Sequence, residues 1–208
     1  MKLLVLGATG GTGLEVVRQA IDRGHSVTAF VRSAGRLKPF SEKIQIKQGD
    51  LLNRFELQSV AQGHDAIISA FGPRLPLSNG DTDLLRRFAA ALTGAMAGAG
   101  LRRVVVESSA FLFKDSFLPP AYLVGRLFFA KIVADAAGME QILTESRLDW
   151  TIVRPPRLTG HAHTGKYRVR DGHLPVFGFN ISRADVADCM IRTAGDPSRI
   201  GKIIGASN

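Results

Sequence analysis

The fold of this chain is decided near its N-terminus, in the stretch Lys2-Leu3-Leu4-Val5-Leu6-Gly7-Ala8-Thr9-Gly10-Gly11-Thr12-Gly13. The apolar run predicts a buried strand, and the glycines predict a tight turn that opens a helix. In such a turn Gly7 makes the bend, Gly10 lets the backbone approach phosphate, and Gly13 lets the helix pack closely on the strand. Backbone N–H groups and a helix N-terminus then face a pyrophosphate, so we expect every residue from Gly7 to Gly13 to bind a dinucleotide.

Strand and helix patterns alternate along the whole chain, which predicts an α/β fold with a parallel sheet. The expected strands are Lys2–Leu6, Ser26–Val31, Ile44–Gln48, Ala66–Ser69, Arg103–Glu107 and Trp150–Val153. The expected helices are Gly11–Arg23, Asn53–Ala61, Asp81–Gly98 with Asp81 as N-cap, a region from Pro119 to about Ser146 with a break near Gly138, and Ser182–Ala194. A short ribbon is expected around Tyr167–Arg170.

This order predicts a single doubly wound Rossmann-type domain over residues 1–208, with helices on both faces of a parallel sheet. Its ligand crevice would lie along the carboxyl ends of the strands. Residues around 111–125 and 159–180 are expected to form a small region that covers the substrate.

Composition narrows the class of protein. A chain of 208 residues with 45% hydrophobic and 22% charged residues is typical of one globular domain. The apolar runs are too short to span a bilayer, and no signal-peptide cleavage region follows the first strand. The single cysteine, Cys189, excludes an internal disulfide and fits a reducing compartment. We therefore expect a cytoplasmic protein, with its oligomeric state left open.

The formal net charge of +9 raises the question of nucleic-acid binding. The basic residues are spread along the chain, and no basic segment is interleaved with aromatic residues. A basic surface also attracts anionic cofactors and substrates. We therefore expect a small-molecule partner and no nucleic-acid or membrane partner.

The segment after the second strand predicts which dinucleotide binds. Arg32, Ser33 and Arg36 stand where an NAD-specific site offers an acidic residue to the ribose hydroxyls. A guanidinium can grip a 2′-phosphate with paired charge-assisted hydrogen bonds. This pattern favours NADP(H), and the alternative is an ordinary solvent-facing basic loop.

The remaining strand ends supply the rest of the expected cofactor site. We expect the adenine at Asp50 and Leu51. The alternative is that Asp50 begins a helix, for which Asn53 is an equal N-cap candidate. We expect a ribose at the next strand end and the nicotinamide at the last two. The full set is Asp50, Leu51, Ala70, Phe71, Gly72, Ser108, Ser109, Pro155, Pro156 and Arg157.

The expected chemistry is limited by what the motifs lack. Many short-chain dehydrogenases use a Tyr-x-x-x-Lys pair, and the nearest match here is Tyr122 followed by Arg126. No G-x-S-x-G elbow surrounds Ser108 and Ser109, which argues against a hydrolase nucleophile. No histidine pattern indicates a metal site. Phe111 and Phe113 are candidates to line an aromatic substrate pocket, with core packing as the alternative.

Several segments together carry a family resemblance: Gly7–Gly13, Val31-Arg32-Ser33, Gly49-Asp50, Ser108-Ser109-Ala110-Phe111-Leu112, Leu148-Asp149-Trp150-Thr151 before Pro155-Pro156, and Ile181–Val186. The chain resembles the atypical short-chain dehydrogenase/reductase superfamily, of its NAD(P)H-binding, NmrA-like kind. Within it the chain looks most like the flavin and biliverdin reductases.

The resemblance implies that NADPH lies across the strand ends, with its nicotinamide beside Ser109 and the Pro155-Pro156 turn. A flat conjugated acceptor would stack on the nicotinamide, and Ser109 would orient it. Arg74 would cover the cofactor or meet an anionic acceptor. Direct hydride transfer between stacked rings needs positioning more than a strong protein acid.

Three functions remain open at this point. The first is an NADPH-dependent reductase of flavins, quinones or linear tetrapyrroles. The second is a non-enzymatic NADP(H)-binding regulator or sensor, which the missing tyrosine–lysine pair and the basic charge favour. The third is a nucleotide-sugar epimerase or dehydratase, which the short length and the same missing pair disfavour.

Overall fold

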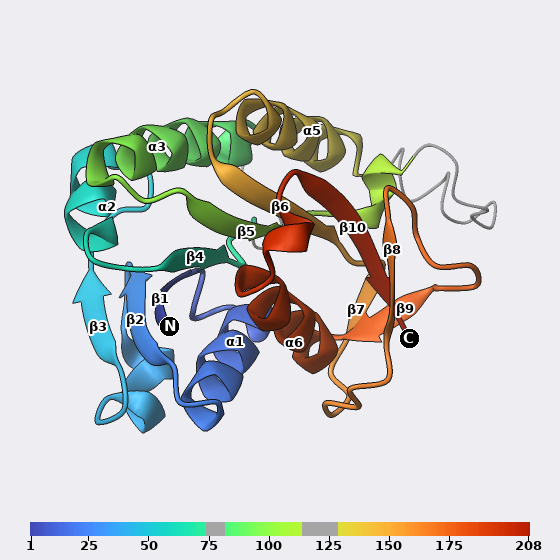
Figure 1. The fold of residues 1–208 in the computed structure, drawn as a ribbon, viewed down its shortest axis with the longest axis horizontal. Helices are drawn as coiled ribbons and strands as arrows, with labels where there is room; N and C mark the ends of the chain where they lie inside the picture. Colours follow the sequence, from blue (N-terminus) through green and yellow to red (C-terminus); the bar gives the residue numbers. More distant parts are fainter. Residues whose placement is uncertain (74–81, 114–128) are drawn as a thin grey trace.

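A central sheet dominates the computed structural model, which describes residues 1–73, 82–113 and 129–208 (Figure 1). In these ranges the sheet has eight strands, in the order β3-β2-β1-β4-β5-β6-β10-β8. All neighbouring strands are parallel except β8, which runs antiparallel to β10. The strands are β1 Lys2–Leu6, β2 Ser26–Val31, β3 Gln45–Gln48, β4 Ala66–Ser69, β5 Arg103–Glu107, β6 Asp149–Arg154, β8 Arg168–Asp171 and β10 Lys202–Ser207.

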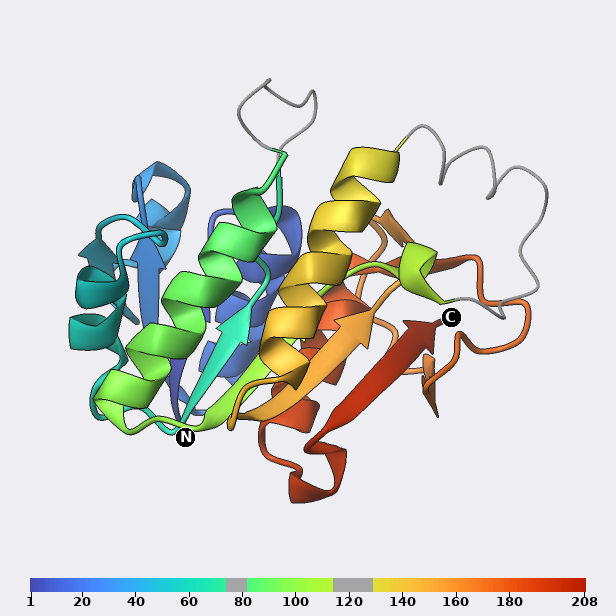
Figure 2. The same cartoon turned by 90° about the horizontal axis from the view of Figure 1, so that it is seen from above.

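Helices cover both faces of the sheet, as Figures 1 and 2 show. One face carries α1 (Gly11–Asp22) and α6 (Arg183–Ala194). The other face carries α2 (Arg54–Ala61), α3 (Leu84–Ala99) and α5 (Ala130–Thr144), and α3 lies beside α5. Smaller elements are the 3-10 turns η1 Gly35–Phe40, η2 Ala110–Leu112 and η3 Pro197–Arg199, and a parallel pair of strands, β7 Arg157–Thr159 and β9 Asn180–Ser182.

Two apolar layers explain the continuous apolar runs in the central strands. In β1, Leu3 and Val5 belong to the layer under α1 and α6, while Leu4 and Leu6 belong to the layer under α2, α3 and α5. All four side chains are fully buried. A strand with helices on both faces needs apolar residues at every position, because side chains alternate between the faces.

The predicted α/β fold with a parallel sheet is confirmed, with corrections at the element ends. The third strand begins at Gln45, and β6 extends from Asp149 to Arg154. The ribbon expected around Tyr167–Arg170 is the edge strand β8. Strands β7, β9 and β10 were not predicted, because each is short or interrupted by polar and glycine residues.

Two helix predictions also change. The third helix begins at Leu84, and the predicted cap Asp81 lies outside the described residues. The helix α5 runs through Gly138 without the expected break. A Cβ at Gly138 would lie 2.3 Å from Cδ of Arg86, so this glycine leaves room for the Arg86 side chain of α3 against α5. The start expected at Pro119 lies outside the described residues.

In the ranges described, no helix is both long and apolar enough to cross a membrane.

Candidate cofactor site and active site

The carboxyl ends of the parallel strands form the edge at which the candidate site lies. The chain passes from β1 to β2 and β3 on one side, and then returns to β4 on the other side of β1. This reversal between β1 and β4 is the position at which doubly wound sheets bind ligands. The glycine-rich turn follows β1 directly, so it opens at this point.

The glycine-rich turn has the tight geometry that the sequence predicts. Gly7 has a φ of +71°, and a Cβ on it would lie 2.5 Å from the carbonyl oxygen of Ala70. A Cβ on Gly13 would lie 2.1 Å from the carbonyl oxygen of Gly7. The N-cap of α1 is Gly10, no side chain caps the helix, and its first turn carries no acidic residue. The helix N-terminus is therefore suited to an anion.

The basic segment after β2 reaches back to this turn. The Nη1 atom of Arg36 donates a hydrogen bond to the carbonyl oxygen of Thr9 at 2.7 Å. Arg32 and Ser33 are exposed directly after β2. A phosphate held near the glycine-rich turn would therefore meet this basic segment beside it. This arrangement suits the 2′-phosphate that the sequence predicts.

Asp50, at the end of β3, was expected either to contact the adenine or to begin a helix, and the structure distinguishes these alternatives. Asn53 is the N-cap of α2, and its Oδ1 accepts from the backbone N–H groups of Phe55 and Glu56 at 3.1 and 3.3 Å. Asp50 Oδ1 accepts from the N–H of Leu52 at 3.0 Å, and the residue is exposed. Leu51 is only 5% exposed and packs in the core, which leaves Asp50 as the group available to an adenine.

The ends of β5 and β6 are tied together where the nicotinamide is expected. The N–H of Ser108 donates to the carbonyl of Val153 at 2.8 Å, and the N–H of Ala110 donates to the carbonyl of Pro155 at 3.0 Å. Ser109 Oγ accepts from the N–H of Phe111 at 3.3 Å. Among the described residues no acceptor takes the hydroxyl hydrogen of Ser109, so this hydroxyl can donate to a ligand.

Ser108 has a different environment, on the α5 face of the sheet, that the sequence did not predict. Its hydroxyl donates to Glu140 Oε1 at 2.5 Å. Arg154 also binds the Glu140 carboxylate, through Nε to Oε1 at 3.0 Å and through Nη2 to Oε2. The guanidinium carbon of Arg154 lies 4.8 Å from the ring centre of Phe113. The pair thus fixes the Ser108 hydroxyl and braces the ends of β5 and β6.

Glu107 is a partly buried acidic residue at the same strand end, and the sequence did not predict a role for it. It ends β5 on the face of α1 and α6, and Thr12 Oγ1 donates to its Oε1 at 3.2 Å. Burial raises the pKa of Glu107 to about 7, while the Thr12 hydrogen bond and the positive charge of Arg183 act in the opposite direction. A carboxyl group of this kind is often part of a functional site.

Other predicted residues have less direct roles. Phe113 is 3% exposed and packs with Ala110 and Leu174 in a small buried cluster, so it offers little surface to a substrate. Phe111 is partly exposed and lies 6.2 Å from Phe129, ring centre to ring centre. Arg74, Tyr122 and Arg126 lie outside the described residues.

The remaining predicted residues lie at the same edge. Phe71 is partly exposed and its ring centre lies 4.7 Å from that of Phe88. Gly72 is exposed, Pro155 is buried, and Arg157 is exposed where β7 begins. The residues expected to hold the cofactor therefore follow β1 to β6 along one edge of the sheet, as their positions after the strands predict. Which of them contact the cofactor stays a prediction.

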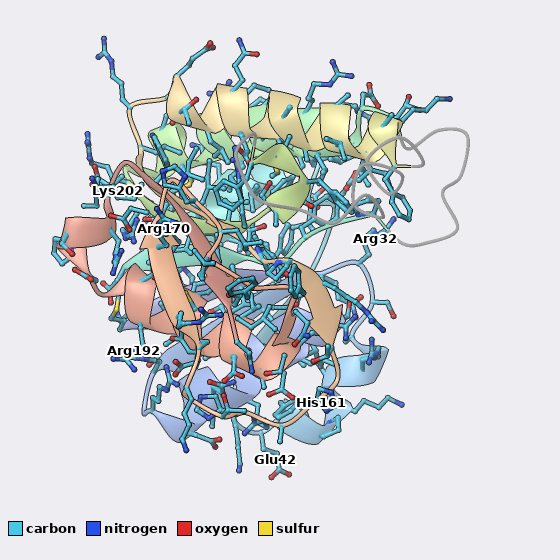
Figure 3. All side chains as sticks on the ribbon, turned by 90° about the vertical axis from the view of Figure 1, so that its right-hand side faces the viewer. Arg32, Glu42, His161, Arg170, Arg192 and Lys202 are labelled. Atoms are coloured by element: carbon cyan, nitrogen blue, oxygen red, sulfur yellow. The ribbon has the colours of Figure 1, made fainter. Side chains whose placement is uncertain are left out.

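A separate hollow of about 620 Å³ lies between α6 and β8. Tyr167, Cys189 and Arg192 are among its lining residues, and none of the predicted site residues lines it. Figure 3 shows Arg192 and Arg32 on opposite sides of the molecule. Burial raises the pKa of the Cys189 thiol to about 11, which makes it unreactive. We therefore place the site at the strand ends and not in this hollow.

Comparisons with known proteins agree with this geometry. A sequence model of a family described as NAD(P)H-binding matches residues 7–197. The chain is 30% identical over 199 residues to the chloroplastic protein At2g34460 of Arabidopsis thaliana. The alignment covers 91% of this chain and 70% of that protein. It is also 30% identical over 198 residues to a 3-diazoavenalumate denitrifying reductase of Streptomyces sp, covering 85% and 64% of the two chains.

A solved structure shares the fold. The anaerobillin reductase ChuY of Escherichia coli O157:H7 superposes with a TM-score of 0.81 and 22% identity, covering 100% of this chain and 97% of that one. At this level of identity the likeness concerns the fold alone. The Rossmann-type α/β prediction is thereby confirmed, and the family match confirms a cofactor of the NAD(P)H type.

Proposed function

The chain belongs to the NAD(P)H-binding family, and from this membership we propose that it is an NADPH-dependent reductase of a flat conjugated acceptor. The acceptor class comprises flavins, quinones and linear tetrapyrroles. The family and its reductase relatives support an NAD(P)H-dependent oxidoreductase in general. The acceptor class, and a place near the flavin and biliverdin reductases, belong to the proposal.

The observation that carries the proposal is the construction of the β5 and β6 ends. Ser109 there has a hydroxyl hydrogen to donate, beside the rigid Pro155-Pro156 turn. Hydride transfer between stacked rings requires the two rings to be held in contact, with few demands on a protein acid. In our proposal the turn supports the nicotinamide and Ser109 orients the acceptor by donating to one of its carbonyl or nitrogen atoms.

The choice of NADPH over NADH rests on the segment after β2. The exposed Arg32 and Ser33 stand where an acidic residue would hold the ribose hydroxyls of NAD(H). Arg36 is anchored on the Thr9 carbonyl and adds a second positive charge. A 2′-phosphate between these groups would accept charge-assisted hydrogen bonds.

The names of two similar proteins add support for a reductase. One relative is called a denitrifying reductase, and one protein of the same fold is called an anaerobillin reductase. The alternative function is an NADP(H)-binding regulator without turnover. At Tyr122 and Arg126 the tyrosine of the Tyr-x-x-x-Lys pair is present but the lysine is replaced by arginine. This favours the alternative, because the lysine is the group that lowers the tyrosine pKa for proton transfer.

A turnover assay separates the two functions. The purified protein is mixed with NADPH or NADH and with FMN, FAD, a quinone or biliverdin, and the nicotinamide absorbance band is followed. We expect NADPH to be consumed with at least one acceptor, and faster than NADH. Tight NADPH binding without turnover on every acceptor would contradict the reductase and favour the regulator.

We also propose a reducing compartment, and specifically the cytoplasm, since the sequence has a single cysteine and therefore no internal disulfide. The proposed partner is the small conjugated acceptor, with neither nucleic acid nor membrane involved.

A further inference from the structure

The carboxyl group of Glu107 lies beneath the glycine-rich turn. It ends β5, and its Oε1 accepts the hydroxyl hydrogen of Thr12, the second residue of α1, at 3.2 Å. The first N–H groups of α1 are within about two helical turns, or 10 Å, of this carboxyl. A pyrophosphate at the helix N-terminus would therefore lie within about 10 Å of the Glu107 carboxyl. This is about one Debye length, so salt would not fully screen the repulsion between the two groups.

Arg183 supplies the positive charge that acts on Glu107. A Cβ on Gly11 would lie 2.6 Å from Cδ and 2.8 Å from Nε of Arg183, so the arginine side chain crosses the first turn of α1. Its positive charge acts on Glu107, but no ion pair joins the two among the described residues. The carboxylate thus lacks the direct partner that stabilises ionised groups in partly buried positions.

Among the described residues, Arg183 is the charged group that acts on Glu107. From α1 it meets the Thr12 hydroxyl, and from α6 it meets Arg183. The adjacent strand β6 carries Arg154, which is bound to Glu140 on the opposite, α5 face of the sheet. The neighbouring strand β4 ends on Ser69, which is not ionisable at neutral pH. An arriving pyrophosphate would therefore add negative charge beside a carboxyl group that forms no ion pair with any described residue.

We propose that Glu107 is part of the cofactor site and carries a proton when NADP(H) is bound, so that binding takes up a proton and affinity falls above neutral pH. The inference rests on the proposed placement of the pyrophosphate at the glycine-rich turn. In the proposed bound state, Oε1 of Glu107 accepts a hydrogen bond from Thr12. Its Oε2 carries the proton and donates to a phosphate or ribose oxygen. An ionised Glu107 would instead repel the phosphates.

The sign of the pH dependence follows from linkage. In the free protein Glu107 titrates at about 7, and the phosphates of the bound cofactor raise its pKa further. Below pH 7 the group is protonated in both states, so affinity is constant. Above pH 7 the free protein loses the proton and the complex keeps it, so the Kd for NADPH rises by up to about tenfold per pH unit.

The test is a set of NADPH titrations by cofactor fluorescence at pH 7.0, 7.5, 8.0 and 8.5, at constant ionic strength. This range lies above the titration of the 2′-phosphate itself, at about pH 6. Wild type should bind several-fold more weakly at the top of the range. Glu107→Gln should give a nearly constant Kd and should bind more tightly than wild type at the highest pH. Glu15→Gln removes a half-buried glutamate of α1 that pairs with Arg18, and it should keep the wild-type slope.

Calorimetry on the wild type provides a test that needs no variant. Titrations at pH 7 in two buffers with different ionisation enthalpies should show uptake of about half a proton per NADPH. A pH-independent Kd in wild type, zero proton uptake, or an unchanged slope in Glu107→Gln would overturn this inference while the reductase activity could persist. Absence of NADPH binding at every pH would overturn the cofactor site and this inference together.

Discussion

Two arginines follow β2, and the structure gives them different roles. Arg36 is already anchored by its hydrogen bond to the Thr9 carbonyl, so it supports the glycine-rich turn from outside. Arg32 is exposed immediately after the strand. A guanidinium in that position is available for bidentate contact with a 2′-phosphate. The proposed cofactor preference therefore depends mainly on Arg32.

Replacing Arg32 with aspartate tests this assignment. Arg32→Asp removes a charge-assisted contact worth about 1.5–3 kcal/mol and places a carboxylate near the phosphate. We expect the Kd for NADPH to rise by about tenfold to a hundredfold. The Kd for NADH should change little, because aspartate can accept hydrogen bonds from ribose hydroxyls.

Fluorescence titration with both cofactors measures the effect. Lys43→Asp is a matched control, since it makes the same charge change at an exposed position farther along the segment. It should weaken NADPH binding by less than about threefold, through general electrostatics alone. If Arg32→Asp weakens NADPH and NADH equally, Arg32 does not contact the 2′-phosphate.

At the scale of elements, α3 begins in a way that no local pattern reveals. Asp83 occupies the N-cap position but makes no capping hydrogen bond. The backbone N–H groups of Leu85 and Arg86 instead donate to the buried carboxylate of Asp135 on α5, at 2.7 and 3.1 Å. The helix cap is thus supplied by a residue about 50 positions away in the chain. Sequence reasoning searches for caps among neighbours, so it could not find this one.

A stability measurement tests the cap. Asp135→Ala leaves two N–H groups of α3 without an acceptor and breaks the contact with Arg86, so we expect a loss of about 2–4 kcal/mol in the free energy of unfolding. Asp83→Ala should cost less than about 1 kcal/mol, because its ion pair among the described residues is an exposed contact with Arg87. Urea denaturation compares the two, and an equal loss would assign the cap to Asp83.

The central elements could be predicted from the sequence because their signals are local. The apolar run of β1 and the glycines after it lie within a few residues of one another, and β2, β4 and β5 are found at their predicted bounds. The strands that were missed lie after β6. In β10, Gly205 interrupts the apolar run, and β7 and β9 have only three residues each. Their pairing depends on the sheet that precedes them, which propensity does not record.

At the scale of the molecule, the end of β5 joins the two faces of the sheet. Glu107 contacts α1 on one face, and Ser108 contacts Glu140 of α5 on the other. These contacts span 95 and 32 residues of sequence, so neither could be predicted from a local motif. The residues after each strand could be proposed as candidate site residues because their position depends on the strand alone. The cofactor turn is a local motif, whereas the site's electrostatics arise from the folded topology.

In the proposed reaction, bound NADPH passes hydride directly to a conjugated acceptor. A single-turnover experiment tests it most directly, by mixing the NADPH-bound protein with FMN, a quinone or biliverdin and following the nicotinamide absorbance. With the reactive acceptor we expect the bound cofactor to be oxidised in one exponential phase that slows when the transferred hydrogen is replaced by deuterium. NADPH that binds and stays reduced with every acceptor would contradict the account.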